Sequence, residues 1–211
     1  FTSSYTVIEP MATVSATMMN VLYAGIDNPV SISVPGVAMG DISASMTNGS
    51  LTRQGDHWIA RPGQVGSDAT VTVTANMDGK PVQMAQTKFR VRKLPDPTPF
   101  IAFKDASGNT DHYRGGKPFK KALLLASPGL EAAIDDGLLD TPFTVESFET
   151  VFFDSSGNAM PEVSNGSQFS QRQKQQFQRL GRGKRFYISR IRAKGPDGLT
   201  RDLSPMEVII N

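Results

Sequence analysis

The sequence predicts a mainly β protein of two domains: an immunoglobulin-like antiparallel β-sandwich over residues 1–94 and an α+β domain with one clear helix over residues 100–211. Three observations lead to this prediction. Short alternating runs separated by turn residues fill the first half. Three prolines stand within residues 95–99, between the halves. The second half mixes strand patterns with a single amphipathic helical stretch.

Alternating apolar and polar side chains predict the strands of the first half. The pattern repeats every two residues in segments 31–34, 42–46 and 69–75, as in strands with one buried face. Asp78 and Gly79 stand between two further alternating runs and predict a tight hairpin. Turn signals at this frequency predict about seven strands. Trp58 is the predicted core aromatic, and the long run 69–77 is a candidate edge strand for pairing between chains.

Residues 95–99 predict a semi-rigid linker between the domains. Prolines at alternate positions fix φ, remove backbone donors and push each preceding residue toward extended conformations. Such a segment takes a polyproline-like form and acts as a spacer. Two modules held at a set distance favour a mechanical or scaffolding role over that of an enzyme.

The second half predicts several strands and one helix. Strand patterns occupy residues 100–103, 143–153, 185–194, 199–203 and 206–210. A helix is predicted within residues 167–181, with Ser170 as its N-cap and Gly181 as its stop. Its narrow apolar stripe consists of Phe169, Phe177 and Leu180. Segment 122–134 fits either a strand or a helix.

Composition limits the classes of function. The 38% hydrophobic and 20% charged residues are typical of a globular protein, and a net charge of +2 does not by itself draw the chain to nucleic acid or membrane. Cysteine is absent, which excludes disulfides, thiolate metal sites and cysteine nucleophiles. No run approaches the roughly 20 apolar residues that span a bilayer. The chain opens at Phe1 without methionine or a signal-peptide pattern, so we expect a piece of a longer protein.

The two histidines predict neither a catalytic nor a metal site. His57 and His112 fall in different predicted domains, and we expect each of them at the surface. Asp56 precedes His57, but adjacent strand residues point to opposite faces, so the two are not expected to form an orienting pair. Two separated histidines without cysteine do not make a usual zinc site. The sequence therefore predicts no catalytic residue, no metal and no cofactor.

Two loops resemble ligand-binding motifs only superficially. Residues 115–118, Gly-Gly-Lys-Pro, lack the spacing and the following hydroxyl residue of a phosphate loop, and we expect a loop before an edge strand. Residues 135–140 are acidic but lack the alternating ligands and closing glutamate of a calcium loop. We expect an exposed acidic turn there.

Charge is segregated along the second half. Residues 122–171 contain eight acids and no base, whereas residues 172–194 contain nine bases and no acid. Two interpretations remain open: the segments neutralise each other across adjacent strands, or the bases form a docking face for an acidic protein. The candidate docking residues are Arg179, Arg182, Lys184, Arg185, Arg190 and Arg192. Nucleic acid is not an expected partner, because few aromatic residues stand among the bases.

Residues 20–29, Asn-Val-Leu-Tyr-Ala-Gly-Ile-Asp-Asn-Pro, resemble the N-V-x-Y-x-G-x-D-N-P segment of the GldM/PorM family. Members of this family form the periplasmic trunk of the type IX secretion and gliding-motility motor of Bacteroidota. Similarity continues downstream, so that the resemblance covers nearly the whole chain. The further similar segments are 63–73, 95–99, 126–130, 143–148, 180–185 and 194–198.

The resemblance implies a non-catalytic, elongated homodimer that is anchored in the inner membrane by a transmembrane helix outside the present residues. It also implies that the trunk carries motion from an inner-membrane motor subunit to an outer-membrane-associated ring, made of a lipoprotein and its partner protein. We therefore expect residues 1–94 to serve as a spacer and self-association domain and residues 100–211 to dock on the ring. The alternative is a carbohydrate- or peptide-binding pair of β-sandwich modules.

Overall fold

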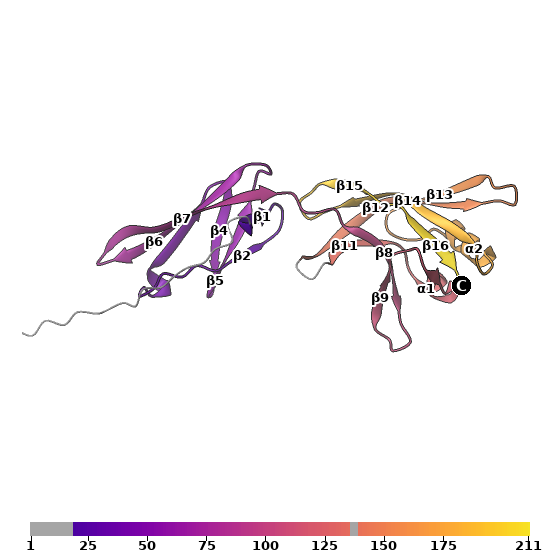
Figure 1. Cartoon of the computed structure of the whole chain (residues 1–211), viewed down its shortest axis with the longest axis horizontal. Coiled ribbons are helices and arrows are strands. Elements are labelled where there is room, and N and C mark those ends of the chain that lie inside the picture. Colours follow the sequence, from indigo (N-terminus) through magenta and orange to yellow (C-terminus); the bar gives the residue numbers. More distant parts are fainter. Residues whose placement is uncertain (1–18, 136–138) are drawn as a thin grey trace, which may run out of the picture. The chain divides into compact units, whose positions relative to one another are not determined.

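The computed structural model describes residues 19–135 and 139–211. The chain divides into two compact units, one ending at Leu94 and the other running from Pro95 to Asn211. Both units consist mainly of strands (Figure 1), which confirms the predicted mainly β class. The first strand of the second unit begins at Thr98, so the last two residues of the predicted linker already lie in a strand.

The first unit is a sandwich of two sheets, with strand orders β1-β7-β6-β3 and β2-β5-β4. Every pair of neighbours is antiparallel, as predicted, except β1 and β7, which run parallel. A short 3-10 helix at Met39–Asp41 precedes β3. The strands are β1 (Val21–Tyr23), β2 (Asn28–Val30), β3 (Ile42–Met46), β4 (Gly49–Gln54), β5 (His57–Pro62), β6 (Asp68–Met77) and β7 (Lys80–Arg92).

The β6–β7 hairpin forms because its two turn residues adopt the left-handed conformation that a tight turn requires. Asp78 has φ 55° and Gly79 has φ 79°, which confirms the predicted hairpin (Figure 1). β6 itself lies between β3 and β7, so the expectation that residues 69–77 form an edge strand is wrong. Among the described residues, β7 between Lys80 and Phe89 has a neighbouring strand on one side only.

Small and branched side chains form the core of the first unit. Trp58 is only 6% exposed, which confirms it as a core aromatic. Alternate residues of β6 are buried, because their side chains face the other sheet. Two clusters of buried apolar residues lie there, one with Leu22, Ala24, Ala60, Ala69 and Val91 and one with Ile42, Val71 and Val73.

The second unit is a bent nine-stranded sheet with two helices. Its main path is β10-β16-β14-β12-β11-β8-β9, while β13 pairs with β12 and β15 pairs with β14. The long strand β12 is central, because it has β14 on one side and β11 followed by β13 on the other. The strands are β8 (Thr98–Lys104), β9 (Thr110–Tyr113), β10 (Pro118–Phe119), β11 (Glu131–Asp135), β12 (Asp140–Phe153), β13 (Ala159–Asn165), β14 (Arg185–Lys194), β15 (Thr200–Leu203) and β16 (Met206–Ile210).

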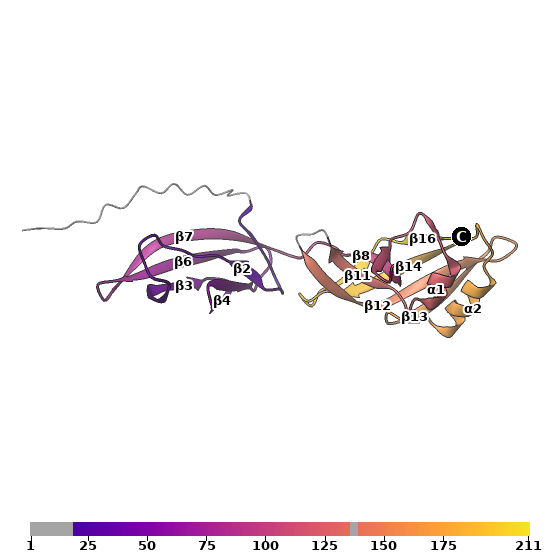
Figure 2. The same cartoon turned by 90° about the horizontal axis from the view of Figure 1, so that it is seen from below.

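Two helices, α1 (Lys121–Ala126) and α2 (Gln171–Arg179), lie next to each other in both views (Figures 1 and 2). Segment 122–134, ambiguous from sequence, contains most of α1 and most of β11. A capping box begins α2: Ser170 Oγ accepts the Gln173 N–H at 3.2 Å, and Gln173 Oε1 accepts the Ser170 N–H at 2.7 Å.

The end of α2 differs from the prediction. The helix stops at Arg179, and Leu180 is already extended, with φ −68° and ψ 127°. Gly181 is not among the glycines with positive φ, so it is not the left-handed stop that the sequence suggests. Lys121 Nζ instead donates to the carbonyl oxygens of Leu180 at 2.8 Å and Gln178 at 3.1 Å, which satisfies acceptors at this helix end.

The inner face of the sheet packs against α2. Phe152 and Phe186 stack with ring centroids 5.3 Å apart, and both contact Phe177 of α2. Arg190 in β14 has φ 49° and forms a bulge, where it stands with Ile191 opposite the single residue Phe148. The bulge returns Ile191 to the inner face, which explains why the alternation of β14 is interrupted there.

Candidate partner-docking surface

Apolar side chains gather on the outer face of the sheet, opposite α2. Val151 pairs with Tyr187 of β14 and with Pro161 of β13, and the ring of Phe153 meets that of Tyr187 edge to face at 6.1 Å. Val163 stands two residues further along β13, on the same face as Pro161. Val163, Phe153 and Tyr187 are 61%, 48% and 37% exposed. We call these five residues, Val151, Phe153, Pro161, Val163 and Tyr187, the open face.

Strand alternation places the open face in solvent. Phe152 and Phe186 point into the core, so their neighbours Phe153 and Tyr187 must point outward. Water has to order around these exposed rings, and covering them is favourable. Contiguous exposed apolar groups of this kind mark protein interaction surfaces on soluble domains. The open face can therefore bind a protein partner by burial of apolar area.

Three of the six candidate bases form ion pairs across the strands of this face. Arg185 Nη1 lies 3.0 Å from Glu207 of β16, Arg190 Nη1 lies 3.4 Å from Glu149 of β12, and Arg192 Nε lies 3.8 Å from Asp202 of β15. Tyr187 Oη also donates to Glu207 at 3.2 Å. Only Glu149 belongs to the acidic segment 122–171, so neutralisation between the two charged segments holds for one of these pairs.

The other three candidate bases stand at one corner of the unit. Arg179 ends α2, and Arg182 and Lys184 lie in the turn before β14. Hydrogen bonds fix that turn to the last strand, because Gly183 N donates to Ile210 O at 2.7 Å and Ile210 N donates to Lys184 O at 2.9 Å. These three bases, which we call the basic corner, form no ion pair within 4.0 Å among the residues that the structure describes.

A pocket of about 240 Å³ joins the basic corner to the open face. It lies between the β12–β13 hairpin and the end of α2. Phe153 belongs both to this pocket and to the open face. The pocket is lined by Phe152, Phe153, Asp154, Ser155, Met160, Gln176, Arg179, Leu180, Gly181 and Lys184.

Asp154 is the one acid in that lining, and its oxygens are engaged in its own turn. Asp154 Oδ1 accepts the N–H groups of Ser156 and Asn158 at 2.8 Å, and Oδ2 accepts Asn158 Nδ2 at 2.8 Å. The side-chain hydrogen bond from Asn158, followed by its backbone N–H, lowers the pKa of Asp154. The carboxylate therefore stays charged but is directed to the turn.

The two histidines meet the expectation only in part, because His57 lies at the surface as expected but contacts its neighbouring aspartate. Asp56 lies in the turn before β5, where strand alternation does not apply, and its Oδ1 is 3.0 Å from His57 Nδ1. This contact corrects the prediction that the two side chains diverge, although both are exposed. His112 is stacked on Phe100 at 3.9 Å and lies 3.2 Å from Asp135, so it is packed rather than free at the surface. The described residues contain no group of three or more His, Cys, Asp or Glu that could hold a metal.

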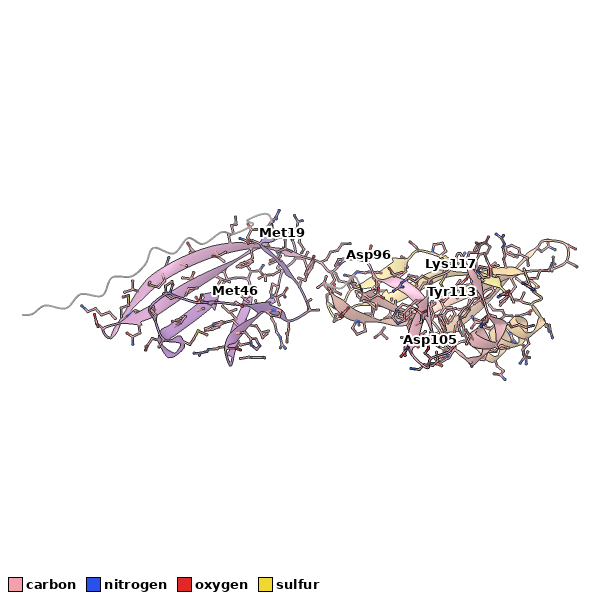
Figure 3. The ribbon with its side chains drawn as sticks, turned by 60° about the horizontal axis from the view of Figure 1, so that its bottom comes forward. Met19, Met46, Asp96, Asp105, Tyr113 and Lys117 are labelled. Atoms are coloured by element: carbon pink, nitrogen blue, oxygen red, sulfur yellow. The ribbon has the colours of Figure 1, made fainter. Side chains whose placement is uncertain are left out.

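Residues 115–118 form the predicted loop before an edge strand, because β10 begins at Pro118. Gly115 has φ 87°, and a Cβ there would lie 2.8 Å from Glu207 O, so close backbone approach requires glycine. Tyr113 Oη donates to Lys117 O at 2.6 Å; both residues are labelled in Figure 3. The loop is thus explained by packing. The acidic loop at 135–140 lies partly outside the described residues, since 136–138 are not described.

Comparison with protein families covers both units. Residues 11–92 match the model of the GldM third domain, and residues 95–211 match that of the GldM C-terminal domain. A search of curated proteins found no match. In the described part of the chain, neither helix is long and apolar enough to cross a membrane. The chain therefore belongs to the GldM family of gliding motility and type IX secretion, and it contains the third and the C-terminal domains of that family.

Proposed function

We propose that this chain is a non-catalytic, periplasmic part of a type IX secretion and gliding-motility trunk. It transmits force from the inner-membrane motor to an outer-membrane-associated ring through protein contacts. The observation that carries the proposal is that the open face lies beside the basic corner. The open face exposes aromatic and branched side chains, and the three bases of the corner have no ion-pair partner among the described residues. Membership of the GldM family supports it.

The second unit supplies the docking surface in this proposal. Aromatic side chains such as Phe153 and Tyr187 bury a large area with little loss of conformational freedom, which suits the centre of an interface. The bases of the corner attract an acidic partner and orient it. Glu149 and Glu207 neutralise Arg190 and Arg185 on this face, so these bases offer no net positive charge to a nucleic-acid backbone.

The first unit supplies self-association. β7 leaves one backbone edge without a strand neighbour from Lys80 to Phe89 in the described structure. Val82 and Met84 on this strand are 42% and 41% exposed, and Met77 at the end of β6 is 47% exposed. Unpaired edges with exposed apolar side chains readily pair with another chain. A second copy at β7 would give the homodimer.

Trp58 does not support carbohydrate binding by the first unit. A sugar-binding groove needs an aromatic ring at the surface, where it can stack on the sugar. Trp58, the single tryptophan of the chain, is only 6% exposed and packed in the core.

Binding to the purified ring lipoprotein and its partner protein tests the proposal. Phe153→Glu places a charge in the open face and should weaken binding about tenfold or more. Leu199→Glu is the matched control, because Leu199 is equally exposed at 48% but lies in the turn before β15. The affinity can be measured by surface plasmon resonance on the 211-residue chain. No binding by the unmodified chain, or equal loss in both variants, contradicts the proposal.

A further inference from the structure

The pocket beside the basic corner is sized for one side chain. Its volume of about 240 Å³ lies below the roughly 300–1,000 Å³ of pockets that hold small-molecule ligands. Its lining includes four apolar residues, Phe152, Phe153, Met160 and Leu180, and two bases, Arg179 and Lys184, against one acid, Asp154. This combination favours an apolar side chain flanked by negative charge.

We propose that an acidic segment of the partner protein inserts one phenylalanine or leucine side chain into this pocket, with its flanking carboxylates against Arg179 and Lys184. The inference rests on the proposed docking function and names the chemistry of the partner at that surface. The inserted side chain supplies affinity through burial, while the two bases supply orientation and attraction.

The local charges support an acidic segment. Arg179, Arg182 and Lys184 are exposed and have no ion-pair partner within 4.0 Å among the described residues. Asp154 contributes the opposing charge, but its oxygens already accept three hydrogen bonds from Ser156 and Asn158. A carboxylate of the partner therefore meets two unpaired bases, whereas a basic segment would be repelled by them.

Strand addition at the neighbouring edge is a poor alternative. Pro161 stands in the middle of β13 and lacks the N–H that a continuous strand ladder needs. The carbonyl of Glu162 already accepts a hydrogen bond from Gln173 Nε2 of α2 at 2.9 Å. The partner thus has to bind through side chains in the pocket and on the open face.

The experiment follows the methyl signals of the 211-residue chain labelled with ¹³C-methyl methionine. The probe is the peptide acetyl-Glu-Glu-Phe-Glu-Glu-amide. We expect a saturable shift of the Met160 signal, assigned with Met160→Leu, while Met77 and Met84 of the first unit stay in place. Peptides with alanine for phenylalanine, or glutamine for glutamate, should bind at least about fivefold more weakly. An unmoved Met160 signal, or equal binding of a lysine-containing peptide, overturns the proposal.

A charge-reversal pair links the pocket to the ring. The variant Arg179→Glu/Lys184→Glu should lose the peptide response and bind the ring proteins at least about tenfold more weakly. The control Arg172→Glu/Lys194→Glu makes the same change of net charge away from the pocket. An unchanged methyl spectrum without peptide verifies the fold of each variant. If the ring proteins bind all forms equally, the pocket proposal fails and the docking function stands; if they do not bind the unmodified chain, the docking function itself fails.

Discussion

Arg201 holds Asp197 in a buried ion pair, with Nη2 2.5 Å from Oδ2 and Nη1 3.0 Å from Oδ1. The two side chains are only 7% and 3% exposed. The guanidinium also lies over the ring of Phe143 at 5.1 Å. Gly195 makes room for the pair, since a Cβ there would lie 2.6 Å from both Asp197 Oδ1 and Phe143 Cε1. The pair thus fixes the turn between β14 and β15 against the long strand β12.

The same guanidinium reaches the start of the unit. Arg201 Nε lies 3.2 Å from Asp96 Oδ1, and Asp96 is labelled in Figure 3. Pro97 and Pro99, on either side of Thr98, are buried. The second half of the proline-rich segment therefore belongs to the second unit.

Removing one member of the buried pair should destabilise the second unit strongly. Arg201→Leu leaves Asp197 buried without its partner, and we expect a loss of about 3–5 kcal/mol in the free energy of unfolding. The double variant Arg201→Leu/Asp197→Leu removes both charges and should lose less than Arg201→Leu alone. Urea unfolding followed by circular dichroism measures both values. If the double variant is less stable than Arg201→Leu, the two charges stabilise the unit by more than cancelling the cost of each other's burial.

The pair also predicts an acid-sensitive step. The hydrogen bond from Arg201 is the largest cause that lowers the pKa of Asp197 below its usual value. A carboxyl group with a lowered pKa adds stability above its unfolded pKa of about 3.9, and this stability is lost as the pH falls through the folded pKa. The free energy of unfolding should therefore decline below about pH 4.

The contribution of Asp197 is isolated by comparison with Asp197→Asn, which cannot titrate. The difference in unfolding free energy between the two proteins should be constant above about pH 5 and shrink toward lower pH. Other carboxyl groups, such as Asp27 and Asp154, titrate in both proteins and cancel in the difference. Parallel stability curves from pH 6 down to pH 2 would contradict the assigned role.

Self-association through β7 predicts a face-dependent effect of lysine substitutions. Val82 is paired with the buried Ala75, so it lies on the apolar face, whereas the next residue, Gln83, lies on the opposite face. Val82→Lys should shift the chain toward monomer by about tenfold or more in dissociation constant, and Gln83→Lys should change it much less. Sedimentation velocity measures the distribution. A monomeric unmodified chain, or equal effects of both lysines, argues against β7 as the interface.

The sequence predicts well those elements that local interactions determine. Asp78 and Gly79 identify the hairpin because the turn itself needs left-handed residues, and Ser170 identifies the start of α2 because the cap lies within four residues. The parallel pairing of β1 with β7 joins residues about seventy positions apart, and no local pattern contains it. For the same reason, the sequence does not predict that β7, and not β6, forms the exposed edge of the first sheet.

The sequence predicts only part of the candidate site. The run of bases identified all six candidates, but strand register decides which have partners: Arg190 reaches Glu149 only because of a bulge at its own position. The sequence does not predict the open face, because Phe153 and Tyr187 are aromatic residues of the kind that usually lie in a core. One signal was present, since apolar residues occur on both faces of segment 143–153 while only one face needs covering.

The division of the six bases into paired and unpaired sets predicts different kinetics of docking. Replacing the basic corner by Arg179→Gln, Arg182→Gln and Lys184→Gln should slow association with the ring proteins about tenfold at low salt and flatten its dependence on ionic strength. Exposed charges without partners act on an incoming protein over roughly 10 Å at 0.1 M salt, while paired charges largely cancel at that range.

The comparison triple, Arg185→Gln, Arg190→Gln and Arg192→Gln, removes the same charge from bases that have acidic neighbours. It should change the association rate less and leave a steeper salt dependence. Stopped-flow measurements between 20 and 500 mM salt separate the two, and equal slopes for both triples would assign the attraction to net charge rather than to the basic corner.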